Sequence, residues 1–264
     1  MSLNICALSI VKWLGAEYPA IQLVFLRASV GFFLMLPWIM RSRLEFSQLS
    51  ESRLHLARVV FSALALVSSF HALSRLPFAL VTAIGFTRPI LTMILAWLLL
   101  NEVISGKRWF AAFVAFSGVF LALQPGNLVR SSGIPAAFLT VLFGTLAIIT
   151  TRYLSNTPVV LMMTFYTLGL TIVSAPLALL LWVPISSEHV VPILSIGIVA
   201  QIAQFCFLKA HYNADAGFLS VLAYLSLVFT TLVGFFVFGE VPTLMFGLGA
   251  SLIVAAAVWT SLSR

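Results

Sequence analysis

Long, uninterrupted apolar stretches constrain the fold of this chain more than any other sequence feature. Residues 20–40 and 77–100 each contain a single charged residue. A run of about 20 apolar residues crosses the hydrocarbon core of a bilayer as one helix, whereas the strands of a membrane barrel read as alternating segments of about ten. The chain is 62% hydrophobic and 8% charged, and a soluble fold of this size could not hide so much apolar surface. We therefore predict an all-α, polytopic membrane protein.

Turn and charge signals divide the chain into about ten helices. The first is too short to cross the bilayer at 1.5 Å per residue, so we expect the sequence to begin inside its first helix. We place the helices at 3–14, 20–40, 57–74, 77–100, 107–124, 132–151, 158–182, 190–209, 216–238 and 243–261.

Basic residues in the loops predict the orientation, because cytoplasmic loops carry an excess of Lys and Arg. One set of loops and the C-terminus holds Arg41, Arg43, Arg53, Arg58, Lys107, Arg108, Arg152, Lys209 and Arg264. The other set holds Lys12, Arg75 and Arg130. We expect the first set to face the cytoplasm of a bacterial-type inner membrane, with both termini on that side. The net charge of +7 is scattered over short loops without a basic stripe, which argues against nucleic-acid binding.

The two halves of the chain align with each other at an offset of about 139 residues. Pro19 matches Pro158, Pro37 matches Pro176, and Glu102-Val103 matches Glu240-Val241. Five helices per half is an odd number, so the second half should enter the membrane upside down. We predict two inverted repeats, 1–126 and 127–264, with a ligand site near the midplane between them, as in many secondary transporters.

Arg88 is the most informative single residue, because it lies at the centre of the helix predicted over 77–100. A charge at that depth costs at least about 2.5–3.5 kcal/mol on insertion scales and should face a cavity or a partner. It could bind a carboxylate or phosphate on a substrate, or it could brace backbone carbonyls. Pro89 next to it removes a backbone donor and should kink the helix.

Other polar and aromatic residues complete two candidate sets, each with plain helix packing as the alternative. The predicted substrate-binding residues are Arg88, Gln204, Tyr224, Gln201, Phe86 and His71. The predicted gating or structural residues are Pro89, Glu102, Glu240, Lys12 and Arg27. No Asp or Glu falls in the middle of a predicted helix, so a buried carboxylate relay for protons is not supported.

The sequence resembles the EamA family of the drug/metabolite transporter superfamily over nearly its whole length. The resemblance rests on Lys12-Trp13-Leu14, Phe25-Leu26-Arg27, Ala72-Leu73, Phe86 to Pro89, Leu100-Asn101-Glu102, Gln204, Ala210, Phe238-Gly239-Glu240 and Leu252-Ile253. It implies ten helices in two inverted repeats and a central cavity lined by helices 1, 3, 4, 6, 8 and 9. It also implies transport of small metabolites, often export of amino acids or related compounds.

We therefore expect a secondary transporter that moves a small polar metabolite bearing a carboxylate or phosphate by alternating access. The alternatives are a channel-like facilitator and an intramembrane enzyme; the latter is disfavoured because HExxH is absent and Asp215 is the only aspartate. No cofactor or metal is expected, because the four His and two Cys form no ligand-spaced cluster. The expected partners are the substrate and the lipid bilayer, and the oligomeric state is open, with a homodimer as one alternative.

Overall fold

The computed structural model describes residues 2–41, 52–88, 91, 94, 95, 98, 106–123, 131–154, 157–213 and 216–262. Within these ranges the chain is helical apart from its connections, and it contains no strand. The helices are α1 (Ser2–Leu14), α2 (Ala20–Arg41), α3 (Ser52–Arg75), α4 (Phe78–Gly85), α6 (Gly106–Leu123), α7 (Gly133–Tyr153), α8 (Val159–Leu180), α9 (Val190–Asn213), α10 (Ala216–Phe238) and α11 (Leu244–Leu262). A short 3₁₀ turn, η2 (Ser187–His189), precedes α9.

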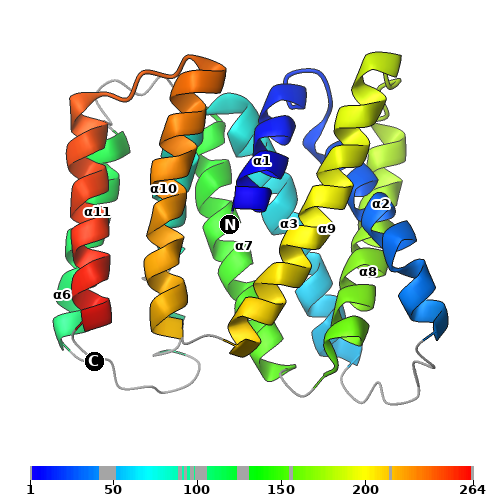
Figure 1. Cartoon of the computed structure of the whole chain (residues 1–264), viewed down its shortest axis with the longest axis horizontal. Helices are drawn as coiled ribbons and strands as arrows, with labels where there is room; N and C mark the ends of the chain where they lie inside the picture. Colours follow the sequence, from blue (N-terminus) through cyan, green and yellow to red (C-terminus); the bar gives the residue numbers. More distant parts are fainter. Residues whose placement is uncertain are drawn as a thin grey trace.

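The helices stand side by side and alternate in direction (Figure 1). The connections between α1 and α2, α8 and α9, and α10 and α11 lie together at the top of that view, which we call the upper end. The helix α1 runs toward the upper end, whereas α7, its counterpart in the second half, runs away from it. The first helices of the two halves therefore run in opposite senses, as an inverted arrangement requires.

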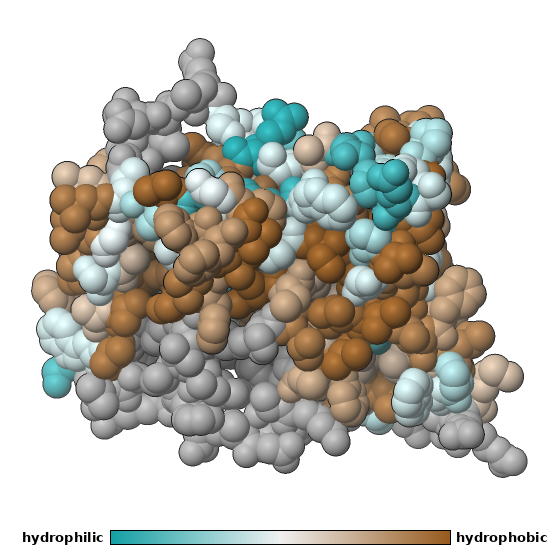
Figure 2. All heavy atoms as spheres, turned by 45° about the horizontal axis from the view of Figure 1, so that its top comes forward, coloured by the Kyte–Doolittle hydropathy of each residue, from teal (hydrophilic) through white to brown (hydrophobic). Residues whose placement is uncertain are grey.

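Apolar composition on all sides makes these segments membrane helices rather than amphipathic surface helices. By length and hydropathy, five of the described helices could cross a membrane: Ala20–Met40, Ser52–Arg75, Gly133–Thr151, Val159–Leu180 and Ser187–Cys206. Figure 2 shows hydrophobic residues over most of the described surface, with hydrophilic residues gathered toward the upper end. The predicted fold class, an all-α polytopic membrane bundle, is confirmed.

Two helix predictions were wrong in detail. The helix predicted over 57–74 begins at Ser52, so Arg53 and Arg58 lie inside α3 and not in a loop. The helix predicted to run unbroken over 77–100 is interrupted: α4 ends at Gly85 and a turn follows at 86–87. The first feature was missed because Ser52, Arg53 and His55 make the start of α3 polar. The second was missed because the composition stays apolar across the break, so apolar periodicity cannot detect it.

The packing of the helices is nearly symmetric between the two halves. The α3 helix packs on α7 and α8, and correspondingly α9 packs on α1 and α2. Three further pairs join equivalent helices of the two halves: α2 with α8, α4 with α10, and α6 with α11. The α2 and α8 helices also carry Pro37 and Pro176 at matching positions. The most extensive contacts between helices therefore cross from one half to the other, which places the shared interior between them.

Candidate functional site

Arg88 follows directly after the break in α4. The amide of Phe86 donates to the carbonyls of Ala83 and Thr82, and the amide of Thr87 donates to the carbonyl of Ile84 at 2.9 Å. These shortened hydrogen bonds tighten the chain into a 3₁₀-like turn. The hydroxyl of Thr87 also donates to the carbonyl of Ile84, at 2.7 Å. Interrupted membrane helices of this kind commonly form the binding sites of transporters, because the freed backbone groups line a cavity.

The guanidinium of Arg88 lies against α7 at a glycine. A Cβ atom placed on Gly144 would be 3.0 Å from Nη2 of Arg88 and 3.4 Å from its Cζ. Arg88 is ten residues below the start of α4 and Gly144 is eleven below the start of α7. Both therefore lie about 15 Å below the upper end, close to half the thickness of a bilayer core.

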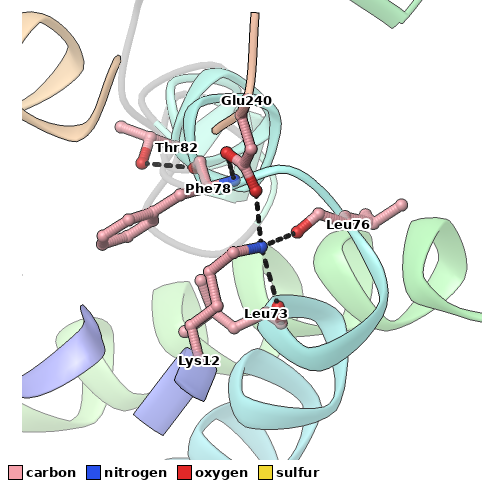
Figure 3. Close-up of polar contacts among 6 residues, drawn as sticks. All are labelled: Lys12, Leu73, Leu76, Phe78, Thr82 and Glu240. Atoms are coloured by element: carbon pink, nitrogen blue, oxygen red, sulfur yellow. Dashed lines mark hydrogen bonds and ion pairs between the residues drawn. The ribbon is translucent and has the colours of Figure 1, made fainter. Parts of the chain in front are cut away.

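Lys12 and Glu240 form an ion pair at the upper end, with Nζ 2.8 Å from Oε1 (Figure 3). The ammonium of Lys12 also donates to the carbonyls of Leu76 at 2.6 Å and Leu73 at 3.3 Å. The second carboxylate oxygen, Oε2 of Glu240, accepts a hydrogen bond of 2.8 Å from the amide of Phe78. One pair of charged side chains therefore joins the ends of four helices, α1, α3, α4 and α10.

A second set of contacts fastens the α1–α2 connection to the α8–α9 connection. Gln22 is fully buried; its Nε2 donates to the carbonyl of Val183 at 2.8 Å, and its Oε1 accepts from the amide of Val183 at 2.9 Å. The hydroxyl of Tyr18 lies 2.9 Å from Nδ1 of His189 and accepts from the amide of Ser186. The two halves are thus tied together at the upper end by paired backbone and side-chain bonds.

Arg27 and Gln201 lie on the facing surfaces of α2 and α9, where glycines let the helices approach closely. A Cβ on Gly31 would be 2.8 Å from Oε1 of Gln201, and a Cβ on Gly197 would be 2.4 Å from Cβ of Val30. Among the residues described, buried Nη1 of Arg27 and buried Nε2 of Gln201 find no hydrogen-bond partner. Both atoms are donors, so this interface offers hydrogen bonds to an acceptor.

His71 lies apart from Arg88, at the upper end of α3. Its Nε2 is 3.1 Å from the hydroxyl of Ser132, and it lines a hollow of about 190 Å³ together with Gly15, Tyr18 and Arg75. In the part of the chain that the structure describes, no group of three His, Cys, Asp or Glu side chains could hold a metal ion.

Arg58 is a buried charge that the sequence reasoning missed, because it was assigned to a loop. Its Nε donates to the hydroxyl of Thr151 at 2.8 Å, its Nη1 donates to the carbonyl of Met162, and its guanidinium lies 5.6 Å from the ring centroid of Tyr166. These contacts join α3 to α7 and α8 below the midplane. A signal was present in the sequence: Arg58 is followed by the apolar residues Val59, Val60 and Phe61.

The remaining predicted residues are only partly described. Pro89 and Glu102 lie outside the described residues, as does the side chain of Tyr224, which belongs to α10. Gln204 is half-buried on α9, one turn below Gln201. Phe86 occupies the turn that ends α4 and packs against the core beside α7.

Three curated bacterial proteins resemble this chain over nearly its whole length. An S-adenosylmethionine uptake transporter of Rickettsia prowazekii is 26% identical, over 94% of this chain and 85% of that protein. A pseudopaline exporter of Pseudomonas aeruginosa is 27% identical, over 97% and 90%. A riboflavin transporter of Rhizobium johnstonii is 27% identical, over 95% and 84%. All three are named as transporters of small metabolites.

A solved structure, titled only as the crystal structure of a protein, shares the fold with a TM-score of 0.67 at 19% identity, covering 99% of this chain and 96% of that one. The sequence also matches one transporter family twice, over residues 7–124 and again over 131–262. Together the two matches span almost the entire chain and coincide with its two sets of helices. The chain belongs to the EamA-like transporter family.

Proposed function

We propose that this protein is a secondary transporter, and not an enzyme, that carries a small polar metabolite with an anionic group across the bacterial inner membrane. The observation that carries the proposal is the placement of Arg88. Its guanidinium lies at mid-depth, directly after an interruption in α4 and against the bare backbone of Gly144. An arginine offers up to five donors in a planar fork that matches carboxylate and phosphate.

The proposed mechanism is alternating access between two halves, 1–126 and 127–264. The most extensive helix contacts join one half to the other, and three of them pair equivalent helices, α2 with α8, α4 with α10 and α6 with α11. This arrangement suits rocking of one half against the other about a pseudo-symmetry axis. The Tyr18–His189 and Gln22–Val183 contacts tie the halves at the upper end. In this proposal the upper end faces away from the cytoplasm, because the loops at the opposite end carry more basic residues.

The relatives guide the choice of solutes to test. The three named above carry S-adenosylmethionine, pseudopaline and riboflavin, in the words of their names, and two of the names specify opposite directions, uptake and export. At 26–27% identity they support a small metabolite as cargo. The anionic group in our proposal comes from Arg88 alone.

A ligand-dependent thermal-shift screen tests the proposal directly. The purified protein would be heated with members of a metabolite panel that includes amino acids, organic acids, sugar phosphates and the three solutes named above. A bound solute at a hundredfold excess over its Kd stabilises the native state by about 2.7 kcal/mol. We expect at least one anion-bearing solute to raise the unfolding midpoint of the wild type but not of Arg88→Gln. If every stabilising solute acts equally on both proteins, Arg88 is not the anchor.

A further inference from the structure

The Lys12–Glu240 ion pair lies at the junction of α3 and α4, where α4 has no side-chain cap from its own N-cap residue. Pro77 stands at the N-cap of α4 and makes no side-chain capping bond. The free amides at the start of a helix carry partial positive charge, and the free carbonyls at the end of a helix carry partial negative charge. Glu240 accepts from the amide of Phe78 at the start of α4, while Lys12 donates to Leu73 and Leu76 at the end of α3. Each charge therefore meets the helix end of opposite sign.

The backbone around Glu240 holds its carboxylate in place. Gly239 adopts φ +66°, a left-handed conformation that glycine tolerates better than other residues. This lets the chain turn back at the end of α10, so that the amide of Glu240 donates to the carbonyl of Gly234 at 2.9 Å. Oε2 of Glu240 is only 2.7 Å from the position that a Cβ on Gly234 would occupy. The Glu240 carboxylate therefore packs directly against the backbone of Gly234, and both of its oxygens have partners, Lys12 for one and the amide of Phe78 for the other.

The helix that Glu240 caps is the one that leads to Arg88. From Phe78 to Gly85 α4 is eight residues long, a rigid segment of about 12 Å. Its first amide is bound by a residue of the second half, and its last residue is followed by the turn that precedes Arg88. A movement of the α10–α11 connection would therefore be transmitted along α4 to the guanidinium.

The ion pair is largely, but not completely, buried. The side chains of Lys12 and Glu240 are 12% and 21% exposed. Water can therefore replace these contacts when the helices separate, so the pair is suited to breaking and forming again. Lys12 lies on α1 and Glu240 follows α10, in the other half of the chain, so separation of α1 from α10 at the upper end breaks the pair.

We propose that Glu240 is a positioning residue for Arg88. While the upper end is closed, the Glu240 carboxylate fixes the first turn of α4. When the contact with Lys12 is lost, α4 is freed and Arg88 is displaced. Opening of the upper end is thereby coupled to a change in the position of Arg88 at the substrate site. The proposal rests on the proposed function only for the role of Arg88. The coupling between Glu240 and α4 can be measured without any solute.

The test measures the reactivity of a cysteine placed at the far end of α4. In a background in which Cys6 and Cys206 are replaced by Ala, Gly85→Cys puts a thiol where a Cβ has no neighbour within 4 Å. Gly106→Cys, at the start of α6 and equally unobstructed, is the matched control. The rate of modification by N-ethylmaleimide is followed in nanodiscs with wild-type Glu240, with Glu240→Gln and with Glu240→Ala. Unfolding midpoints establish that each variant is folded.

We expect Glu240→Ala to change the rate at position 85 at least fivefold and to leave the rate at position 106 unchanged. Glu240→Gln should act more weakly, because its amide oxygen can still accept from Phe78, and Lys12→Arg should behave as wild type. Equal rates at position 85 in all proteins would overturn the proposal. A parallel change at both positions would also overturn it, because that result means general loosening.

A transport experiment separates this inference from the proposed function. If Glu240 acts through Arg88, Glu240→Ala and Arg88→Gln should raise the KM for the same solute, and the double variant should be no worse than Arg88→Gln alone. If the increases in KM from the two single variants multiply in the double variant, Glu240 acts independently of Arg88, and the positioning role is wrong. If Arg88→Gln transports normally, the proposed substrate anchor fails, and the cysteine rates still decide whether Glu240 controls α4.

Discussion

Gly144 offers a way to move Arg88 without mutating it. An alanine Cβ at this position would lie 3.0 Å from Nη2, 3.4 Å from Cζ and 3.6 Å from Nε of Arg88. Non-bonded heavy atoms prefer separations of about 3.5–4.0 Å, so Gly144→Ala should push the guanidinium away by about 0.5 Å. The branches of Gly144→Val reach farther and should force the guanidinium out of its position altogether.

Gly144→Ala should weaken solute binding while leaving the free energy of unfolding unchanged or higher. Alanine favours a helix over glycine by roughly 0.5–1 kcal/mol, so the unfolding midpoint should hold or rise. The KM for the transported solute should increase a fewfold. Gly144→Val should raise it at least tenfold, which corresponds to about 1.4 kcal/mol of binding, and overpacking should cost about 1–3 kcal/mol of stability.

The assay pairs solute uptake into proteoliposomes with thermal unfolding followed by tryptophan fluorescence, for which the chain has six Trp. Gly106→Ala, whose Cβ meets nothing within 4 Å, is the matched control and should behave as wild type. If Gly144→Val transports with a wild-type KM, the guanidinium does not contact solute from the position described, and the reasoning fails.

Three further variants test the packing around the site through the unfolding midpoint. Gln22→Met removes two hydrogen bonds to Val183 and should cost about 1–3 kcal/mol; an unchanged midpoint would mean that the upper end is not held there. Gly249→Ala would put a Cβ 2.3 Å from the carbonyl oxygen of Gly118 and should destabilise by about 1–3 kcal/mol, and a neutral result would show that α6 and α11 separate freely. Arg27→Met removes a buried donor without a partner among the described residues and should leave stability unchanged or higher, whereas a large loss would reveal an acceptor.

Much of the fold could be predicted from sequence because lipid imposes one rule on every segment. A membrane-spanning stretch must satisfy its own backbone, so apolar runs become helices. The helix starts predicted at residues 20 and 77 lie close to where α2 and α4 begin, because Pro19 and Pro77 mark the turns before them. The break at 86–87 was missed because the composition of the segment stays apolar across it.

The candidate site was less predictable, because its contacts join residues far apart in the chain. Glu240 and Lys12 were predicted separately as gating or structural residues, and nothing in the sequence indicated that they meet each other at the start of α4. The hydrogen bonds between Gln22 and the backbone of Val183 could not be predicted either, because a backbone partner can be any residue type and leaves no signature in the sequence. Arg88, in contrast, was recognisable because a charge in an apolar run requires an explanation.

Counterflow with the solute found in the screen tests the central claim most directly. Proteoliposomes are loaded with unlabelled solute and diluted into a trace of labelled solute, and the internal label is followed with time. We expect a transient accumulation of label that saturates with solute concentration for the wild type. In Arg88→Gln, because the KM is raised, the accumulation at the same solute concentration should be strongly reduced at an unchanged unfolding midpoint. Accumulation by Arg88→Gln at the wild-type level, or entry that rises linearly with concentration and never exceeds equilibration, would contradict the claim.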